Sequence, residues 1–143
     1  YRVLAEQVLN KLLQGQVGRT QYKTAETPLP GGEFDPQQFD QLVEEYQQSY
    51  NWLPPEVVHR YARAYGTRMD RFLRGSKSVE DLGKHFGDHV FEAEIVYLVK
   101  YEFAREVEDI FWRRSKLGVH VSEETMDAVE KALPKLKKEL LDE

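Results

Sequence analysis

The 143-residue chain contains no cysteine, which excludes disulfide frameworks, cysteine-based zinc sites and thiol catalysis. Its nine glycines and six prolines are ordinary usage and exclude collagen-like and low-complexity classes. Its apolar runs are only a few residues long, against the roughly 20 needed to cross a bilayer. The 20 basic residues are outnumbered by 25 acidic ones, and the net charge of -5 argues against a dedicated nucleic-acid binder. The length is that of one domain with a single sizeable core.

Helical periodicity dominates what the chain does contain. Apolar residues recur at the 3.6-residue spacing of amphipathic helices along most of the sequence. Strand alternation is unconvincing, with one ambiguous stretch at 118–121. The sequence therefore predicts an all-α fold, a single compact multi-helix domain. The predicted helical segments are 1–14, 36–50, 55–65, 67–73, 91–116 and 123–140.

Residues with known capping preferences support several of these boundaries. The expected helix caps are Asp35, Ser78 with Asp81, and Ser122, and Gly66 is placed as a left-handed helix terminator. A continuous helix over 91–116 would be roughly 39 Å long at 1.5 Å per residue. That is long for a domain of this size, so we expect a break near Phe103 to Arg105.

Two histidines at helical spacing invite a metal-site hypothesis. His85 and His89 stand at i and i+4 and are followed by Glu92 and Glu94, which are residue types that bind zinc or iron. Two glycines interrupt this stretch, however, and the pattern is not H-E-x-x-H. The sequence favours solvent-facing or helix-capping histidines, and we predict no metal site.

The densest basic cluster is residues 113–116, Arg-Arg-Ser-Lys, at a predicted helix end. Arginine can grip phosphates or carboxylates with its planar fork, so an anion site is one reading. The structural alternative is favoured, because cations at a helix C-terminus oppose the helix dipole and can pair with Glu106, Glu108 or Asp109. Neither a G-x-G-x-x-G nor a G-x-x-x-x-G-K-[ST] phosphate loop occurs.

Residues 92–118 carry a specific resemblance. They read EAEIVYLVKYEFAREVEDIFWRRSKLG, which resembles the C-terminal helical domain of the FAD-dependent, aerobic and quinone-linked glycerol-3-phosphate dehydrogenases. The segments TPLPGG at 27–32, ARAYG at 62–66 and DLGKHFG at 81–87 resemble further motifs of that family. The sequence departs from the family pattern at Tyr101, Phe103 and Ser115, where histidine, tryptophan and threonine are usual. The resemblance covers essentially the whole chain.

This resemblance implies a C-terminal appendage of a two-domain flavoenzyme. Its expected parts are residues 1–14, a helix continuing from the absent FAD domain, residues 15–34, a connecting loop, and residues 35–143, the C-terminal helical domain. The start at Tyr1, in mid-pattern and without a methionine, fits a piece excised from a longer chain. No catalytic, cofactor-binding or metal residue is expected within this chain.

The resemblance also implies the activity of the parent enzyme. The parent would oxidise sn-glycerol 3-phosphate to dihydroxyacetone phosphate through FAD and pass electrons to quinone. It would be a homodimer, bound peripherally to the inner face of the cytoplasmic membrane, without a nucleic-acid partner. The piece itself would be catalytically inactive and would pack against the FAD and substrate domain of the same polypeptide.

Three readings of this domain follow. The favoured one is a structural cap, in which Glu102, Asp109, Arg113 and Arg114 form an internal ion-pair network that fixes two helices. One alternative is the related C-terminal domain of a glycerophosphate oxidase. The other is an independent helical module that binds an anionic partner through residues 113–116.

Overall fold

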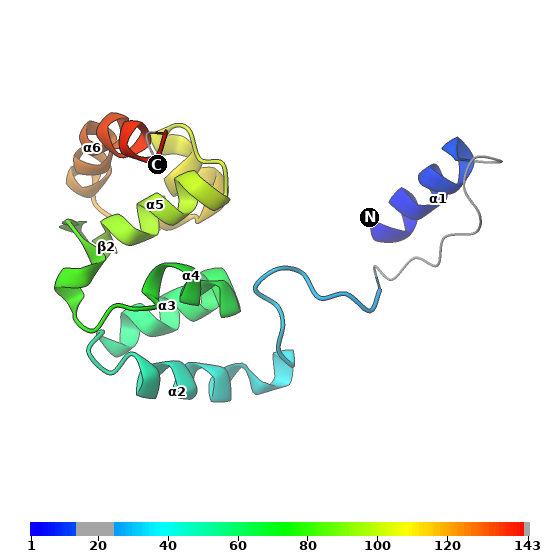
Figure 1. Ribbon diagram of the computed structural model, residues 1–143, viewed down its shortest axis with the longest axis horizontal. Helices are drawn as coiled ribbons and strands as arrows, with labels where there is room; N and C mark the ends of the chain where they lie inside the picture. Colours follow the sequence, from blue (N-terminus) through cyan, green and yellow to red (C-terminus); the bar gives the residue numbers. More distant parts are fainter. Residues whose placement is uncertain (14–24, 142–143) are drawn as a thin grey trace.

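The computed structural model describes residues 1–13 and 25–141, and these fold almost entirely as helices (Figure 1). The α-helices are α1 (Arg2–Leu12), α2 (Phe39–Ser49), α3 (Pro55–Tyr65), α4 (Asp70–Leu73), α5 (Glu92–Tyr101) and α6 (Glu123–Leu141). Short 3-10 turns cover Pro36–Gln38, Gly66–Met69, Val79–Leu82 and Leu117–Val119, and a π-helical turn covers Asp109–Arg114. The prediction of an all-α fold is confirmed.

The ambiguous stretch at 118–121 does not form a strand. That stretch begins within a 3-10 turn, and the only sheet among the described residues is an antiparallel hairpin of β1 (His85–Gly87) and β2 (Val90–Phe91). The hairpin turns through Gly87, Asp88 and His89, all of which have positive φ. Strands of three and two residues are too short to give a period-2 signal in the sequence.

The core lies between α3, α4, α5 and α6. Helix α3 buries the five residues that its periodicity predicts, namely Val57, Val58, Tyr61, Ala62 and Tyr65. Helix α2 covers α3 on one side, and α5 contacts both α4 and α6 (Figure 1). Met69, Leu73, Ile95 and Phe111 are also fully buried and belong to the same core.

The predicted break in the 91–116 segment is confirmed. Helix α5 ends at Tyr101, and Phe103 takes a positive φ of 57° immediately after it. The backbone N–H groups of Glu102 and Ala104 both donate to the carbonyl oxygen of Leu98, which closes the helix end. The chain then turns and re-enters helical geometry at Val107, and the π-helical turn follows from Asp109.

The predicted caps are present. Asp35 accepts a hydrogen bond from the backbone N–H of Gln37 at 2.9 Å, and Ser122 accepts one from Thr125 at 3.3 Å. Ser78 and Asp81 form a reciprocal capping box around Val79–Leu82. Because these caps form, the boundaries of the helical elements lie close to the positions that the capping residues predict.

The segment that enters the domain is fastened to the end of α3. The N–H of Thr67 donates to the carbonyl oxygen of Gly31 at 3.1 Å, and Glu33 accepts hydrogen bonds from Gly31 N and the Thr67 hydroxyl at 2.8 and 2.5 Å. A Cβ added to Gly66 would lie 1.8 Å from the Gly31 oxygen. Only glycine allows this close approach at a φ of 54°.

Helix α1 lies apart from the other helices (Figure 1) and buries none of its residues. Its apolar side chains are Val3, Leu4, Val8, Leu9 and Leu12, and they are 43–71% exposed. Residues 14–24, which include most of the predicted loop 15–34, lie outside the described residues. Within the described part, no helix has the length and apolar character to cross a membrane.

Candidate functional site

A buried carboxylate joins α3 to α5. Glu94 is fully buried, and its two oxygens accept hydrogen bonds of 2.7 and 2.9 Å from the two terminal nitrogens of Arg60. The Tyr65 hydroxyl donates to the same carboxylate at 2.6 Å, and Arg60 also donates to the carbonyl oxygen of His89 at 2.9 Å. Glu94 was a candidate metal ligand by its spacing from His85 and His89, but its partner in the structure is a guanidinium.

The surroundings of Glu94 keep the neighbouring groups in fixed protonation states. Burial alone would lower the pKa of Arg60, but the Glu94 carboxylate outweighs it, so this pKa lies above its ordinary value. Burial and the nearby negative charge raise the pKa values of Tyr61 and Tyr65 well above their usual range. Arg60 also lies over the Tyr61 ring, 4.5 Å from its centroid. The cluster is therefore a buried ion pair surrounded by neutral phenols.

A second arginine–carboxylate pair lies further along the same two elements. Arg68 donates to the Glu102 carboxylate at 2.9 Å, and the Tyr97 hydroxyl donates to it at 2.6 Å. Both this pair and the Arg60–Glu94 pair join residues that are 34 positions apart. Equal offsets mean that α3 with its following turn and α5 run in the same direction, held in one register.

The four residues of the predicted ion-pair network lie at the end of α5 and in the π-helical turn. Asp109 and Arg113 pair at 2.8 Å, one helical turn apart. The Glu102 carboxylate faces Arg68, whereas Arg114 donates its Nε–H to the Glu102 backbone carbonyl oxygen at 2.8 Å. Arg113 is 56% exposed and Arg114 is also exposed.

Asp109, the first residue of the π-helical turn, fastens the segment that precedes the turn. Besides Arg113, it accepts hydrogen bonds from the backbone N–H groups of Arg105 and Glu106 at 2.8 and 3.1 Å. The hydrogen bond from Arg113 and these backbone donors lower the pKa of Asp109 to about 2. Within residues 113–116, Arg113 is therefore paired with Asp109, an acid of the same π-helical turn.

The two histidines of the metal hypothesis are both exposed. The ring centroids of His85 and His89 are 6.3 Å apart, and His89 Nε2 lies 3.8 Å from a carboxylate oxygen of Glu56. No group of three or more histidine, aspartate or glutamate residues in the described ranges is arranged to hold a metal ion.

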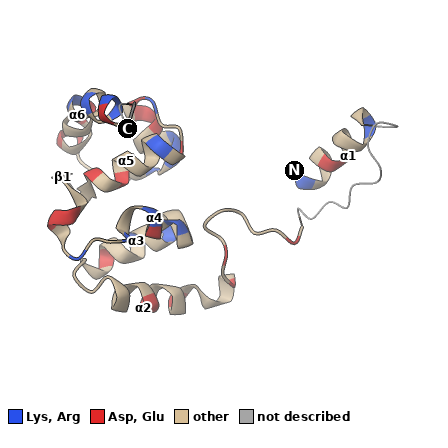
Figure 2. Cartoon of the chain, in the orientation of Figure 1, with Lys and Arg blue, Asp and Glu red and all other residues tan. Residues whose placement is uncertain are grey.

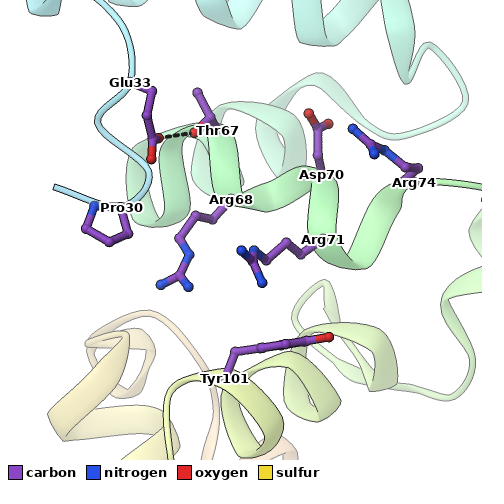
Figure 3. A pocket seen from close by; sticks show the side chains of 8 residues that line it. All are labelled: Pro30, Glu33, Thr67, Arg68, Asp70, Arg71, Arg74 and Tyr101. Atoms are coloured by element: carbon purple, nitrogen blue, oxygen red, sulfur yellow. Dashed lines mark hydrogen bonds between the residues drawn. The ribbon is translucent and has the colours of Figure 1, made fainter. Parts of the chain in front are cut away.

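A cleft opens between α4 and the end of α5. Its volume is about 750 Å³, and it is lined by Pro30, Glu33, Thr67, Arg68, Asp70, Arg71, Arg74 and Tyr101 (Figure 3). Figure 2 marks the basic residues in and beside α4. A smaller neighbouring cleft of about 370 Å³ shares Pro30 and Arg68 with it and also includes Glu102 and Arg114.

Arg60 and Arg68 are the site residues that the sequence analysis missed. Each finds its carboxylate 34 positions away, so no local spacing signals the pair. The charge at Glu94 was visible as a polar residue within an apolar helical face. Such a residue predicts a buried partner, but its identity depends on the tertiary fold.

Nothing in the described residues fits a dinucleotide such as FAD. A dinucleotide cradle uses a parallel βαβ unit with a glycine-rich turn at a helix N-terminus, whereas the sheet here is one antiparallel hairpin of five strand residues. No redox step is therefore assigned to residues of this chain.

The sequence of this chain matches a family model and several known proteins. Residues 22–141 match the family model for the C-terminal domain of alpha-glycerophosphate oxidase. A glycerol-3-phosphate dehydrogenase of Pseudomonas aeruginosa is 44% identical over 122 residues, which are 85% of this chain and 24% of that protein. The D-erythritol 1-phosphate dehydrogenase of Brucella abortus is 38% identical over 125 residues, 86% of this chain and 24% of that protein.

The aerobic glycerol-3-phosphate dehydrogenase of Escherichia coli shows the same pattern. It is 35% identical over 129 residues, which are 90% of this chain and 26% of that protein. The chain thus spans about a quarter of the length of the curated relatives that it matches.

Proposed function

Because the chain belongs to the family of C-terminal domains of alpha-glycerophosphate oxidase, we propose that it is the C-terminal structural domain of a larger FAD-dependent glycerol-3-phosphate dehydrogenase. The observation that carries this proposal is the match to dehydrogenases over 85–90% of the chain but only 24–26% of their length. The remaining three quarters would hold FAD, the substrate and the catalytic residues.

The parent enzyme would oxidise the secondary alcohol of sn-glycerol 3-phosphate to the ketone of dihydroxyacetone phosphate. FAD would supply the two-electron acceptor, and the electrons would pass on to quinone. The parent would be a homodimer associated peripherally with the inner face of the cytoplasmic membrane, with no nucleic-acid partner. The relationship to dehydrogenases named for glycerol and erythritol phosphates supports a polyol phosphate as the substrate class.

Within that enzyme the domain would act as a rigid cap. Two arginine–carboxylate pairs with equal offsets lock α3 against α5, and this supports a structural role for the helical body. The Asp109–Arg113 pair and the Arg114–Glu102 hydrogen bond would fix the chain after α5 in the same way.

Helix α1 would be the last helix of the FAD domain, with residues 15–34 as the connection and 35–143 as the cap. Two observations support this division. The family match begins at residue 22, after α1. The apolar side of α1 is covered by nothing in the described part of the chain, and an apolar face of this kind belongs against another body of protein.

The second candidate is a glycerophosphate oxidase, which would reduce oxygen instead of quinone. The description of the matching family model favours it, whereas the names of the curated relatives favour the dehydrogenase.

The test is the enzyme that contains this chain, purified with everything encoded before Tyr1. We expect a flavin absorption band, reduction of a soluble quinone by glycerol 3-phosphate, and little hydrogen peroxide. Hydrogen peroxide as the main product would establish the oxidase. Turnover of erythritol phosphate but not of glycerol 3-phosphate would show that erythritol phosphate is the substrate. The 143-residue chain by itself should bind no flavin, and a stoichiometric flavin band in that preparation would contradict the assignment.

A further inference from the structure

The cleft between α4 and α5 presents two cationic side chains to one space. Figure 3 shows Arg68 and Arg71 reaching from the α4 side into the space above the Tyr101 ring. The two acids of the lining are bound elsewhere. Asp70 accepts hydrogen bonds from the hydroxyls of Tyr46 and Tyr50, at 3.4 and 2.6 Å, and points away from Tyr101 (Figure 3).

The second acid of the lining, Glu33, is held at the rim. Its carboxylate accepts hydrogen bonds from the Thr67 hydroxyl and the Gly31 N–H, which, with the charge of Arg68, lower its pKa. Arg68 pairs through one nitrogen with Glu102, whereas Arg71 has no carboxylate partner among the described residues. The guanidinium of Arg71 in this cleft is therefore not balanced by an ion pair with any described residue.

Arg71 is positioned by an aromatic ring. Its guanidinium lies 5.2 Å from the centroid of Tyr101. Contact through the face of a guanidinium leaves the N–H groups at its edge free to donate in its plane, and this edge matches the two oxygens of a phosphate. Arg68, beside it, would add a second guanidinium to the same anion (Figure 3).

We propose that this cleft binds a phosphate group, with Arg71 as its main ligand, Arg68 as the second, and Tyr101 holding the Arg71 guanidinium in place. A dianion balances two neighbouring guanidinium groups, of which one is only partly neutralised by Glu102. The volume of about 750 Å³ also leaves room for a small organic group attached to the phosphate. This site is separate from residues 113–116, and it rests on the cleft geometry rather than on the proposed activity.

The phosphate could come from inorganic phosphate or from a small polyol phosphate. Isothermal titration of the 143-residue chain with inorganic phosphate, sn-glycerol 3-phosphate and glycerol separates the sources. We expect saturable binding of both phosphates, with a Kd of about 1 mM, and none of glycerol. Glycerol 3-phosphate binding more tightly would identify the polyol phosphate as the ligand, and equal affinities would identify free phosphate.

Three variants locate the binding. Arg71→Gln should weaken phosphate binding at least about tenfold, the loss of roughly one charge-assisted hydrogen bond. Arg74→Gln should have a small effect, since Figure 3 shows Arg74 beside Asp70 and away from Tyr101. Arg63→Gln, an exposed residue of α3 outside the cleft, should change nothing.

Backbone amide shifts in NMR provide the second measurement. Phosphate should shift the signals of Arg71 and Tyr101 and leave residues 113–116 unmoved. Shifts confined to 113–116, equal loss of binding in Arg71→Gln and Arg63→Gln, or no saturation up to about 10 mM phosphate would each overturn the proposal.

Discussion

Arg60 holds both oxygens of Glu94, at 2.7 and 2.9 Å, across the interface between α3 and α5. The pair joins a completely buried carboxylate to a guanidinium that keeps 23% of its side-chain surface exposed. Tyr65 completes the shell of the carboxylate with a third hydrogen bond. The ionised form of Glu94 is therefore satisfied only while α3 and α5 stay in register.

The first prediction removes that charge. Glu94→Gln keeps the shape of the side chain but leaves Arg60 without its counter-charge. Breaking one side of a buried ion pair costs about 3–5 kcal/mol. Urea unfolding should show a loss of stability of that order. Glu44→Gln, on the exposed side of α2, should stay within about 0.5 kcal/mol of the unsubstituted chain. Equal stabilities for the two variants would show that the pair contributes nothing.

The second prediction concerns the contact between the entering segment and the end of α3. Gly66→Ala should destabilise the domain much more than Gly75→Ala. Both positions have positive φ, so both variants carry backbone strain of about 1–3 kcal/mol. Only at Gly66 would the new Cβ meet a backbone oxygen, that of Gly31, whereas nothing lies within 4 Å at Gly75. Comparing the thermal melts of the two variants isolates the effect of the clash at Gly66. Equal losses of stability would contradict the close approach of Gly31 to Gly66.

The third prediction follows from the buried phenols. Burial, together with the Asp70 carboxylate, raises the pKa of Tyr46 to about 12. Burial also raises the pKa values of Tyr50, Tyr61, Tyr65 and Tyr97. The folded state thus favours the neutral phenol, so stability should be full below pH about 10 and decrease as the pH rises through about 12.

The absorbance of the tyrosines at alkaline pH measures their ionisation directly. In the folded chain, most tyrosine ionisation should occur above pH about 10, and the delay should disappear in denaturant. Titration of all the tyrosines near their ordinary pKa in the folded chain would show that these hydroxyls are open to water.

The fourth prediction concerns acid. The hydrogen bonds from Arg113 and the backbone hold the pKa of Asp109 at about 2, below its usual 3.8. The stabilisation is present above pH 3.8 and is lost as the pH falls through about 2. Urea melts between these values should therefore show a steeper decline for the parent than for Asp109→Asn. Glu108→Gln, the exposed neighbour, should behave like the parent, and a parallel decline in Asp109→Asn would contradict the role of this carboxylate.

Local features of the fold could be predicted from the sequence, whereas the pairings across it could not. Asp35, Ser122 and the Ser78–Asp81 box act on amides within three residues, so their chemistry is legible in a short window. The buried positions of α3 follow from periodicity in the same way.

The hairpin at 85–91 and the α3–α5 register depend on longer-range contacts. The hairpin strands are too short for a period, and their turn uses positive φ at Asp88 and His89, a conformation that non-glycine residues adopt only in about a few per cent of cases. Arg60 and Arg68 meet acids 34 positions away, so the sequence shows four charges without showing which belong together. The cleft over Tyr101 exists only because α4 and α5 are brought side by side.

The back-to-back approach of Gly31 and Gly66 constrains how this domain can be exchanged between relatives. The two glycines lie on opposite sides of residue 35, where the helical body was expected to begin, yet the backbone of Gly31 fills the space that a Cβ at Gly66 would need. A chimera joined at residue 34 would take the two glycines from different relatives, so it keeps this contact only where both relatives have glycine at these positions. Functional crossovers should therefore fall before Pro30, so that both glycines are inherited together.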